Sequence, residues 1–299
     1  MQPLKLLESR HPDKLAARRF DALIGIDAQK DELLFTLKNI LDKKGMENWI
    51  KHHHSKRGLP YLEGILASDS MIILSGDVGC GKTELAHSIG TPLSKEMGDE
   101  TIVLFETPSD IRTGGHVGEL SGRVTSAFDS AKNSLRKGEY GILLIDEADD
   151  LATSRDQMQA HHEDRSGVNV LIKEIDKVQR DNLPLAVILI TNRPNSIDPA
   201  VLRRASLHLK FGRPDESILN TLLEKVFEGV PFNNGSIKEL AKACFKREIP
   251  YSYSDITNRI GKRSLIFAWK QNIPLTKDII LEIISKTEPS PIITETHKA

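Results

Sequence analysis

Hydrophobic residues along the chain are arranged in two different patterns. Up to about residue 211, short and uniformly apolar runs alternate with segments whose apolar residues recur at helical spacing. Uniformly apolar runs are typical of strands that are buried on both faces of a parallel sheet. Strands that alternate with helices therefore predict an α/β fold, in which helices sandwich a parallel sheet. The predicted strands are residues 71–74, 101–105, 141–145, 185–190 and 206–211.

From Pro214 onward, the apolar residues follow helical spacing alone. The helices predicted there are residues 216–227, 236–244, 254–270 and 277–286. In the earlier part of the chain, a helix is expected over 32–41, before the first strand, and others over 122–135 and 167–178, between strands. This change of pattern predicts four parts. They are a short N-terminal segment over residues 1–20, an α/β domain over 21–211, a smaller helical domain over 212–286 and a flexible tail over 287–299.

Composition and charge limit the classes of function. A net charge of −1 leaves no broad basic surface, which argues against nucleic acid as a partner. No apolar run is long enough to span a bilayer and no signal-peptide core is present, so we expect a cytoplasmic protein without a membrane partner. Cys80 and Cys244 lie far apart and fit neither a disulfide framework nor a metal site.

Three consecutive histidines, His52, His53 and His54, raise the question of a metal site. Adjacent residues of a helix point in different directions, and no carboxylate or cysteine cluster lies nearby in the sequence. We therefore favour a solvated basic turn over a metal site at this position.

One stretch matches the P-loop pattern G-x-x-x-x-G-K-[ST] at every fixed position. Its residues are Gly76, Asp77, Val78, Gly79, Cys80, Gly81, Lys82 and Thr83, and Glu84 follows. Glycines let the backbone curl so that its N–H groups face nucleotide phosphates, the lysine reaches the β- and γ-phosphates, and the threonine hydroxyl binds Mg²⁺. A strand-type run precedes the stretch and a helical pattern follows it. We expect ATP and Mg²⁺ as cofactors, with an ordinary glycine-rich turn as the alternative.

Polar side chains follow two of the predicted strands. A residue at the carboxyl end of a parallel strand lies beside the P-loop crevice, so Asp146 is expected to hold Mg²⁺ and Glu147 to orient and deprotonate the attacking water. The next strand along the chain ends just before Asn192, whose amide is expected to hydrogen-bond the γ-phosphate and the water. The alternatives are two exposed carboxylates at a strand end and a turn-forming asparagine.

In order and spacing, these motifs resemble the AAA+ ATPases of the protein-remodelling branch. The resemblance covers about residues 20–270, and the residues that carry it are Leu23-Ile24-Gly25-Ile26-Asp27, the P-loop, Asp146-Glu147, Thr191-Asn192 and residues 197–204. It implies a ring, usually a hexamer, with nucleotide between the subunits and with the helical domain as a lid. It also implies an adenine pocket at Ile24 and Gly25 and the sensor 1 role for Asn192.

Arg203 and Arg204 are the candidates for an arginine finger, which acts across a subunit boundary. Aligned with two-finger enzymes, Arg203 matches the first finger, while Ser206 occupies the second position. The sequence from Arg204 to Pro214 looks more like the single-finger region of the pachytene-checkpoint ATPases, which remodel HORMA-domain proteins. We favour Arg204 as the finger, with Arg203 as the alternative.

His116, Val117, Gly118 and Glu119 resemble the substrate-gripping pore loop of the same branch. Flat side chains in such a ring hold an extended polypeptide by packing on its backbone. His116 departs from the usual aromatic residue, and the alternative is a glycine-rich loop before an ordinary helix. No sensor 2 arginine is clear from the sequence, and Arg259 is a weak candidate.

The resemblance implies an ATP-driven remodeller or unfoldase that works as a homo-oligomeric ring, expected to be a hexamer, and pulls a polypeptide through a central pore. Short bacterial relatives of the pachytene-checkpoint enzymes imply a HORMA-domain protein of an antiphage signalling system as the client. A nucleic-acid motor or clamp-loader-like ATPase is the alternative, and the neutral charge disfavours it. A scaffold that binds ATP without turnover is disfavoured by the intact P-loop lysine and strand-end carboxylates.

Overall fold

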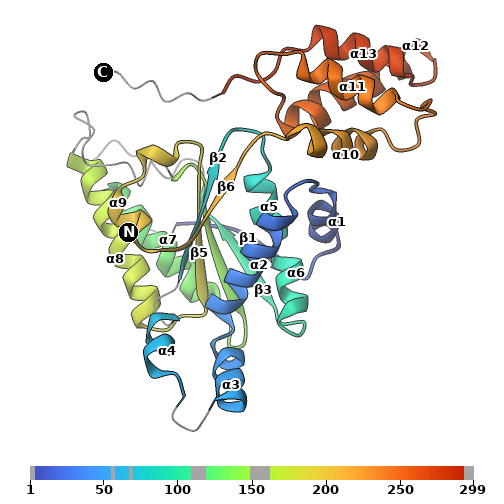
Figure 1. Cartoon of the computed structure of the whole chain (residues 1–299). Coiled ribbons are helices and arrows are strands. Elements are labelled where there is room, and N and C mark those ends of the chain that lie inside the picture. The colour runs from blue at the N-terminus through green and yellow to red at the C-terminus, as the bar shows by residue number, and fades with distance from the viewer. Residues whose placement is uncertain (1–3, 55–57, 67–69, 109–118, 149–161, 293–299) are drawn as a thin grey trace. The chain divides into compact units, whose positions relative to one another are not determined.

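A six-stranded sheet forms the centre of the α/β part of the molecule (Figure 1). The computed structural model describes residues 4–54, 58–66, 70–108, 119–148 and 162–292. The strand order is β1-β3-β4-β5-β2-β6, in which β3, β4, β5 and β2 are parallel neighbours and β1 runs antiparallel to β3. The strands are β1 (Leu7–His11), β2 (Met71–Gly76), β3 (Ile102–Glu106), β4 (Tyr140–Ile145), β5 (Leu185–Thr191) and β6 (Ala205–Phe211).

The α/β fold predicted from the hydrophobic pattern is confirmed, and each of the five predicted strands is present. Strand β1 was not predicted. Four of its five residues are exposed, because it is an edge strand, and a sequence of this kind lacks the apolar run that marks a central strand.

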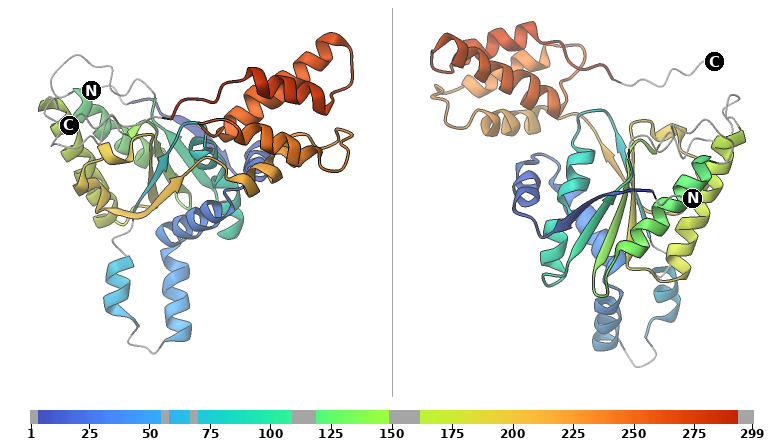
Figure 2. Two further views of the ribbon diagram at one scale, coloured as in Figure 1. Left: turned by 45° about the horizontal axis from the view of Figure 1, so that its top comes forward. Right: turned by 180° about the vertical axis from the view of Figure 1, so that it is seen from behind.

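Helices cover both faces of the sheet, as the two opposite views show (Figure 2). One face carries α7 (Glu119–Ser134) and α8 (His162–Arg180), and the other carries α2 (Asp27–Leu41), α5 (Lys82–Ser88) and α6 (Gly90–Glu96). Side chains alternate between the faces of a strand. Accordingly, Leu143 and Ile145 of β4 join the apolar core with α7 and α8, while the intervening Leu144 is buried but belongs to no part of that core.

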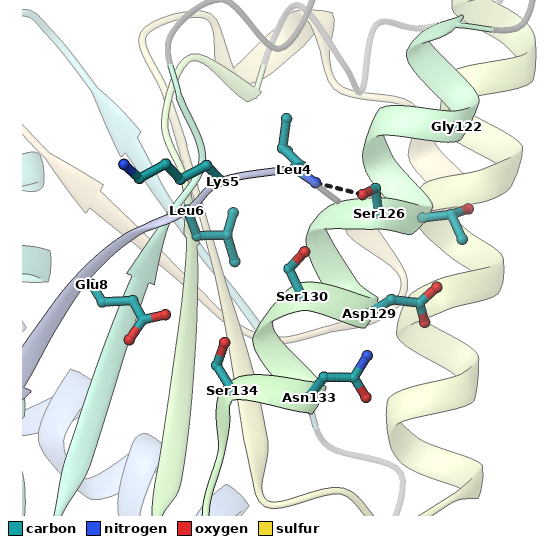
Figure 3. A pocket seen from close by; sticks show the side chains of 11 residues that line it. Leu4, Lys5, Leu6, Glu8, Gly122, Ser126, Asp129, Ser130, Asn133 and Ser134 are labelled. Atoms are coloured by element: carbon teal, nitrogen blue, oxygen red, sulfur yellow. Dashed lines mark hydrogen bonds between the residues drawn. The ribbon is translucent and has the colours of Figure 1, made fainter. Parts of the chain in front are cut away.

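The N-terminal segment runs alongside α7, where the Leu4 backbone N–H donates to Ser126 Oγ at 2.8 Å (Figure 3). A pocket of about 870 Å³ lies between the two, lined by Leu6 and by a row of small polar side chains that includes Ser130 and Ser134. None of the residues that line it belongs to the predicted nucleotide site.

Short helices connect the larger elements of the α/β part. They are α1 (Lys14–Ala22), α3 (Lys43–His53), α4 (Pro60–Leu66), the 3₁₀ helix η2 (Pro194–Ser196) and α9 (Pro199–Leu202). The three histidines, expected in a turn, instead form the last turn of α3 and the residue after it, and all are exposed. Within the described ranges, no group of three or more histidine, cysteine or carboxylate side chains could hold a metal ion.

By contacts, the chain divides into two compact units. An α/β unit comprises Met1–Ala22, Ala28–Ser75 and Thr83–Lys210, and a helical unit comprises Leu23–Asp27, Gly76–Lys82 and Phe211–Ala299. The helices of the second unit are α10 (Glu216–Val226), α11 (Ser236–Phe245), the π-helix η3 (Asp255–Gly261), α12 (Lys262–Gln271) and α13 (Lys277–Lys286). Residues 76–82, which are most of the P-loop, are therefore grouped with the helical unit. The four-part division drawn from the sequence stays a prediction.

Helices α10, α11, η3 and α13 share one apolar core, with Leu223, Leu240, Ile256 and Ile280 fully buried. At the start of α10, the Asp215 side chain caps the helix by accepting from the Ile218 N–H. In the part of the chain that the structure describes, no helix has the length and apolar character that crossing a membrane requires.

Candidate nucleotide-binding site

The P-loop connects the end of β2 at Gly76 to the start of α5 at Lys82. Gly76 has φ +139°, and a Cβ there would lie 2.0 Å from the Phe211 carbonyl oxygen, so the position admits only glycine. Gly79 has φ +74°, and a Cβ there would lie 2.8 Å from Ser252 Oγ. The loop therefore has the strand, turn and helix order that a phosphate-binding loop requires.

Lys82 is directed back into the loop. Its Nζ donates to the carbonyl oxygens of Gly76 at 2.9 Å and Asp77 at 2.7 Å, and the residue is 4% exposed. Burial raises the pKa of the Cys80 thiol to about 11, with the charge of Asp77 adding to the shift. The thiol is therefore protonated at neutral pH and acts as a small packing group rather than as a nucleophile.

Thr83 and Asp146, the two residues predicted to bind a magnesium ion, are brought together, and their role as ligands stays a prediction. Thr83 Oγ1 donates to Asp146 Oδ2 at 2.9 Å, and the other carboxylate oxygen, Oδ1, accepts from the Glu147 backbone N–H at 2.8 Å. Glu147 has φ +54°, a left-handed conformation that is uncommon outside glycine and that turns the chain directly after the strand. Its side chain is exposed.

Asn192 follows the last residue of β5 and is half-buried. Register pairing joins Thr191 of β5 to Ser75 of β2, and the neighbouring β4 ends at Ile145, opposite Leu189 of β5. The ends of these three parallel strands therefore lie at one edge of the sheet. The structure places Asn192 at the same edge as Asp146, and its role at the γ-phosphate stays a prediction.

The two candidate arginine fingers have different environments. Arg204 forms a bidentate pair with Asp176 of α8, through Nε to Oδ1 at 2.7 Å and Nη2 to Oδ2 at 3.1 Å, and it donates to the Ala200 carbonyl at 3.0 Å. The hydrogen bond to Asp176 raises the pKa of Arg204. Arg203 is exposed, and its Nε donates to the Pro199 carbonyl at 3.2 Å. Arg204 is thus fixed in one direction within its own chain.

The predicted adenine-pocket residues Ile24 and Gly25 belong to the helical unit. Tyr253 donates its hydroxyl to the Gly25 carbonyl oxygen at 3.2 Å, and Ile24 packs against the apolar core of that unit. Burial raises the pKa of Tyr253 to about 12, so the hydroxyl remains a donor at physiological pH. The sequence did not predict this contact of Tyr253, because a hydrogen bond to a backbone carbonyl 228 residues away leaves no local pattern.

Arg259, the weak sensor 2 candidate, donates through Nη1 to Asp255 Oδ1 at 2.8 Å and to Ser290 Oγ at 3.2 Å. Both partners are structural groups of the helical unit, so these contacts give Arg259 a packing role within that unit. His116, Val117 and Gly118 lie outside the described residues, and Glu119 is the first residue of α7. The pore-loop assignment stays a prediction.

The fold and the motifs together define a class. Residues 72–213 match the family model described as "ATPase family associated with various cellular activities (AAA)". The parallel sheet and the P-loop between β2 and α5 agree with that match. The molecule is an AAA ATPase.

Relatives over nearly the whole chain narrow the class. CD-NTase-associated protein 6 of Escherichia coli strain MS 115-1 is 35% identical over 291 residues, which cover 94% of this chain and 93% of the relative. The protein of that name from Escherichia coli strain KTE188 is 30% identical over 284 residues, which cover 94% of this chain and 95% of the relative. This chain belongs to the CD-NTase-associated protein 6 family of AAA ATPases.

Solved structures give the same result. A chain in the structure of the E. coli MS115-1 HORMA:CdnC:Trip13 complex matches with a TM-score of 0.87 and 33% identity, over 97% of this chain and 98% of that chain. Rhizobiales Trip13 matches with a TM-score of 0.73 and 28% identity, over 95% of this chain and 98% of that chain. The resemblance to the HORMA-remodelling branch that the sequence indicated is therefore confirmed at the level of the family.

Proposed function

We propose that this ATPase remodels a HORMA-domain protein of a bacterial antiphage signalling system, working as a homo-oligomeric ring with six copies as the expected number. The proposal is supported by the relatives: one matched structure is a complex that contains HORMA, CdnC and Trip13 components, and the matched sequences are CD-NTase-associated proteins. The proposal adds to the ATPase activity a protein client and a use for the energy of hydrolysis, which is to pull on that client.

The observation that carries the chemistry is the hydrogen bond between Thr83 Oγ1 and Asp146 Oδ2 at 2.9 Å. A hydroxyl and a carboxylate oxygen are ligands that Mg²⁺ accepts, and they sit at the start of the P-loop helix and the end of a parallel strand. These residues fit a nucleotide with its magnesium ion. When bound, ATP supplies the phosphoanhydride bond whose hydrolysis provides the free energy for remodelling.

Each polar side chain of the site has a role in the proposal. Lys82 would exchange its two loop carbonyls for phosphate oxygens, and Asp146 would hold the metal ligand sphere together with Thr83. Glu147 would accept the proton of the attacking water, for which its exposed carboxylate is suited. Asn192 would orient that water by donating and accepting hydrogen bonds at the same sheet edge.

Arg204 is the proposed finger that a subunit offers to its neighbour. To do this, it would have to leave or share the carboxylate of Asp176, which holds it in a bidentate pair within its own chain. A finger held in this way is not available until an interface forms, which would link hydrolysis to assembly. The loop from His116 to Glu119 would contact the client inside the ring.

The test uses Glu147→Gln, which keeps the size and hydrogen bonding of the side chain but removes the base. With ATP, the variant is expected to lose hydrolysis by at least about 100-fold and to accumulate as a ring in native mass spectrometry. It is then expected to hold the HORMA-domain protein encoded nearest to its gene. Glu100→Gln, an exposed carboxylate in the same unit, is the matched control. A monomer with undiminished hydrolysis contradicts both the role of Glu147 as the base and the assembly into a ring. A ring that does not bind the HORMA-domain protein contradicts the proposed client.

A further inference from the structure

Asp77 places a carboxylate inside the phosphate-binding loop. An anionic group there would repel a triphosphate, and a desolvated charge is costly unless it is paired. Asp77 is paired: Arg213 Nε donates to its Oδ2 at 2.5 Å, and the Val78 backbone N–H donates to its Oδ1 at 2.8 Å. Both side chains are largely buried, with 7% of Arg213 and 14% of Asp77 exposed. The negative charge of the loop is therefore cancelled by one buried arginine.

Arg213 uses its other two nitrogens on backbone carbonyls. Nη1 donates to Pro250 O, directly before the turn that contains Tyr253, and Nη2 donates to Pro291 O at 3.1 Å in the segment after α13. A guanidinium offers five N–H donors in a planar fork, so a single side chain can hold three separate segments. A lysine at this position keeps the charge but cannot make these contacts simultaneously.

Further contacts within the helical unit reach the middle of the loop. The Ser254 backbone N–H donates to the Gly79 carbonyl oxygen at 3.0 Å, and Ser252 Oγ would lie only 2.8 Å from a Cβ on Gly79. The loop is thus held at Asp77 by Arg213 and at Gly79 by the turn that precedes η3. All of these residues belong to one compact unit.

The segment after α13 is part of the same arrangement. The Ser290 backbone N–H and hydroxyl both donate to the buried carboxylate of Asp255, at 3.0 and 2.6 Å, and the Tyr251 hydroxyl donates to the Ile284 carbonyl at 3.2 Å. These contacts keep Pro291 next to Arg213. Residues that the sequence assigned to a tail therefore help to support the loop.

We propose that Arg213 is a positioning residue of the ATPase site, which neutralises Asp77 so that the P-loop accepts an anionic triphosphate and holds the first half of the loop in place. The proposal rests on the P-loop being the nucleotide site. Without Arg213, Asp77 remains as an uncompensated charge beside the phosphates, and the loss of binding free energy is larger for a nucleotide that carries more negative charge.

The experiment is a double-mutant cycle of Arg213→Met and Asp77→Asn, read by isothermal titration calorimetry with ATPγS and with ADP. In the background of the native Asp77, Arg213→Met is expected to raise the Kd for ATPγS roughly 10- to 100-fold, and the Kd for ADP less. In the background of Asp77→Asn, the same replacement is also expected to raise the Kd for ATPγS, but by a factor at least about five times smaller, because no carboxylate is left to neutralise.

Steady-state ATPase rates give the readout that a purely structural role does not move. Arg213→Met is expected to raise KM with little change in kcat, since the residue does not contact the reacting atoms. Arg247→Met is the matched control, because Arg247 likewise joins the same C-terminal segment, through Glu288 and the carbonyls of Ile284 and Ser285, but does not contact the P-loop. Its Kd for ATPγS should stay within about twofold of the native value.

Equal effects of Arg213→Met in both backgrounds, or a Kd for ATPγS within twofold of native, overturn the proposal. If Arg213→Met does not fold, Arg213→Lys is measured in the same two backgrounds. Retained affinity, or a loss that shrinks in the Asp77→Asn background, supports neutralisation of Asp77, and a loss that is equal in both backgrounds refutes it. Lys82→Ala separates this inference from the proposed function. If Lys82→Ala binds ATPγS normally, the assignment of the P-loop as the nucleotide site is wrong. If Lys82→Ala loses binding while Arg213→Met binds ATPγS like the native protein, only the role proposed for Arg213 is wrong.

Discussion

Replacing Asp255 by asparagine tests how much of the stability of the helical unit depends on one buried carboxylate. Asp255 Oδ1 accepts from Arg259 and from the Ser290 hydroxyl at 2.8 and 2.6 Å, and Oδ2 accepts from the backbone N–H groups of Ser252 and Ser290 at 3.0 Å each. Asparagine has one acceptor oxygen, so its NH₂ group would face two donors. The variant is expected to lose about 3 kcal/mol of unfolding free energy at pH 7.

The pH dependence of the unfolding free energy shows how much of this stability comes from the charge of Asp255. Burial raises the pKa of Asp255, but the hydrogen bonds from Ser290, Arg259 and Ser252 outweigh it and bring the pKa from 3.8 to about 2. That difference corresponds to about 2 kcal/mol of stability. Because the folded-state pKa is the lower of the two, the contribution is fully present above pH 5 and is lost as the pH falls toward 2, with about half of it gone at pH 3.

The assay is urea unfolding followed by hydrogen exchange of peptides from α10, α11 and α13, so that the transition of the helical unit is read separately from that of the α/β unit. The difference in unfolding free energy between the native chain and Asp255→Asn should shrink by about 1 kcal/mol between pH 6 and pH 3. Glu224→Gln on the exposed side of α10 is the control and should shift neither value. A difference that stays constant over this pH range refutes the assignment of the charge to these hydrogen bonds.

Two further predictions concern hydrolysis. Asp146→Asn should lower kcat by at least about 100-fold at 1 mM Mg²⁺, because an amide is a weaker ligand than a carboxylate, and part of the activity should return at about 20 mM Mg²⁺. ATPase titrations with Mg²⁺ measure this, and an unchanged Mg²⁺ requirement contradicts the role of Asp146 as a ligand. Arg204→Ala should lower the ATPase rate of the assembled protein by roughly 10³-fold and Arg203→Ala far less; full activity in Arg204→Ala contradicts the finger assignment.

The strands and the site motifs could be predicted because their information is local. Central strands of a parallel sheet are apolar throughout, so β4 and β5 stand out from the chain around them. The P-loop, Asp146 and Asn192 are marked by a fixed spacing within one segment or by their position at a strand end. Strand β1 was not predicted, because most of its side chains are exposed and its sequence contains no apolar run.

The partners of the charged site residues could not be predicted in the same way. Arg213 and Asp77 are 136 residues apart, and Arg204 and Asp176 are 28 residues apart on different elements. Nothing in the local pattern indicates that either pair meets, since the chain has 41 basic and 42 acidic residues to combine. One signal was available in principle: a carboxylate in a loop that binds phosphate requires a buried cation, and this requirement predicts that a partner exists without naming it.

The contacts of the P-loop also determine which parts of the molecule must respond to a nucleotide. Gly76 is the last residue of β2 and Lys82 is the first of α5, so the loop is covalently continuous with the α/β unit at both ends. Between those ends, Asp77 and Gly79 are hydrogen-bonded to Arg213 and to the turn before η3, in the helical unit. Any change of the loop that phosphates impose must therefore act on these contacts. Replacing Arg213 removes the side-chain contact to Asp77 and leaves the backbone contact at Gly79 in place, so it is the most direct way to test what the Asp77 contact contributes to phosphate binding.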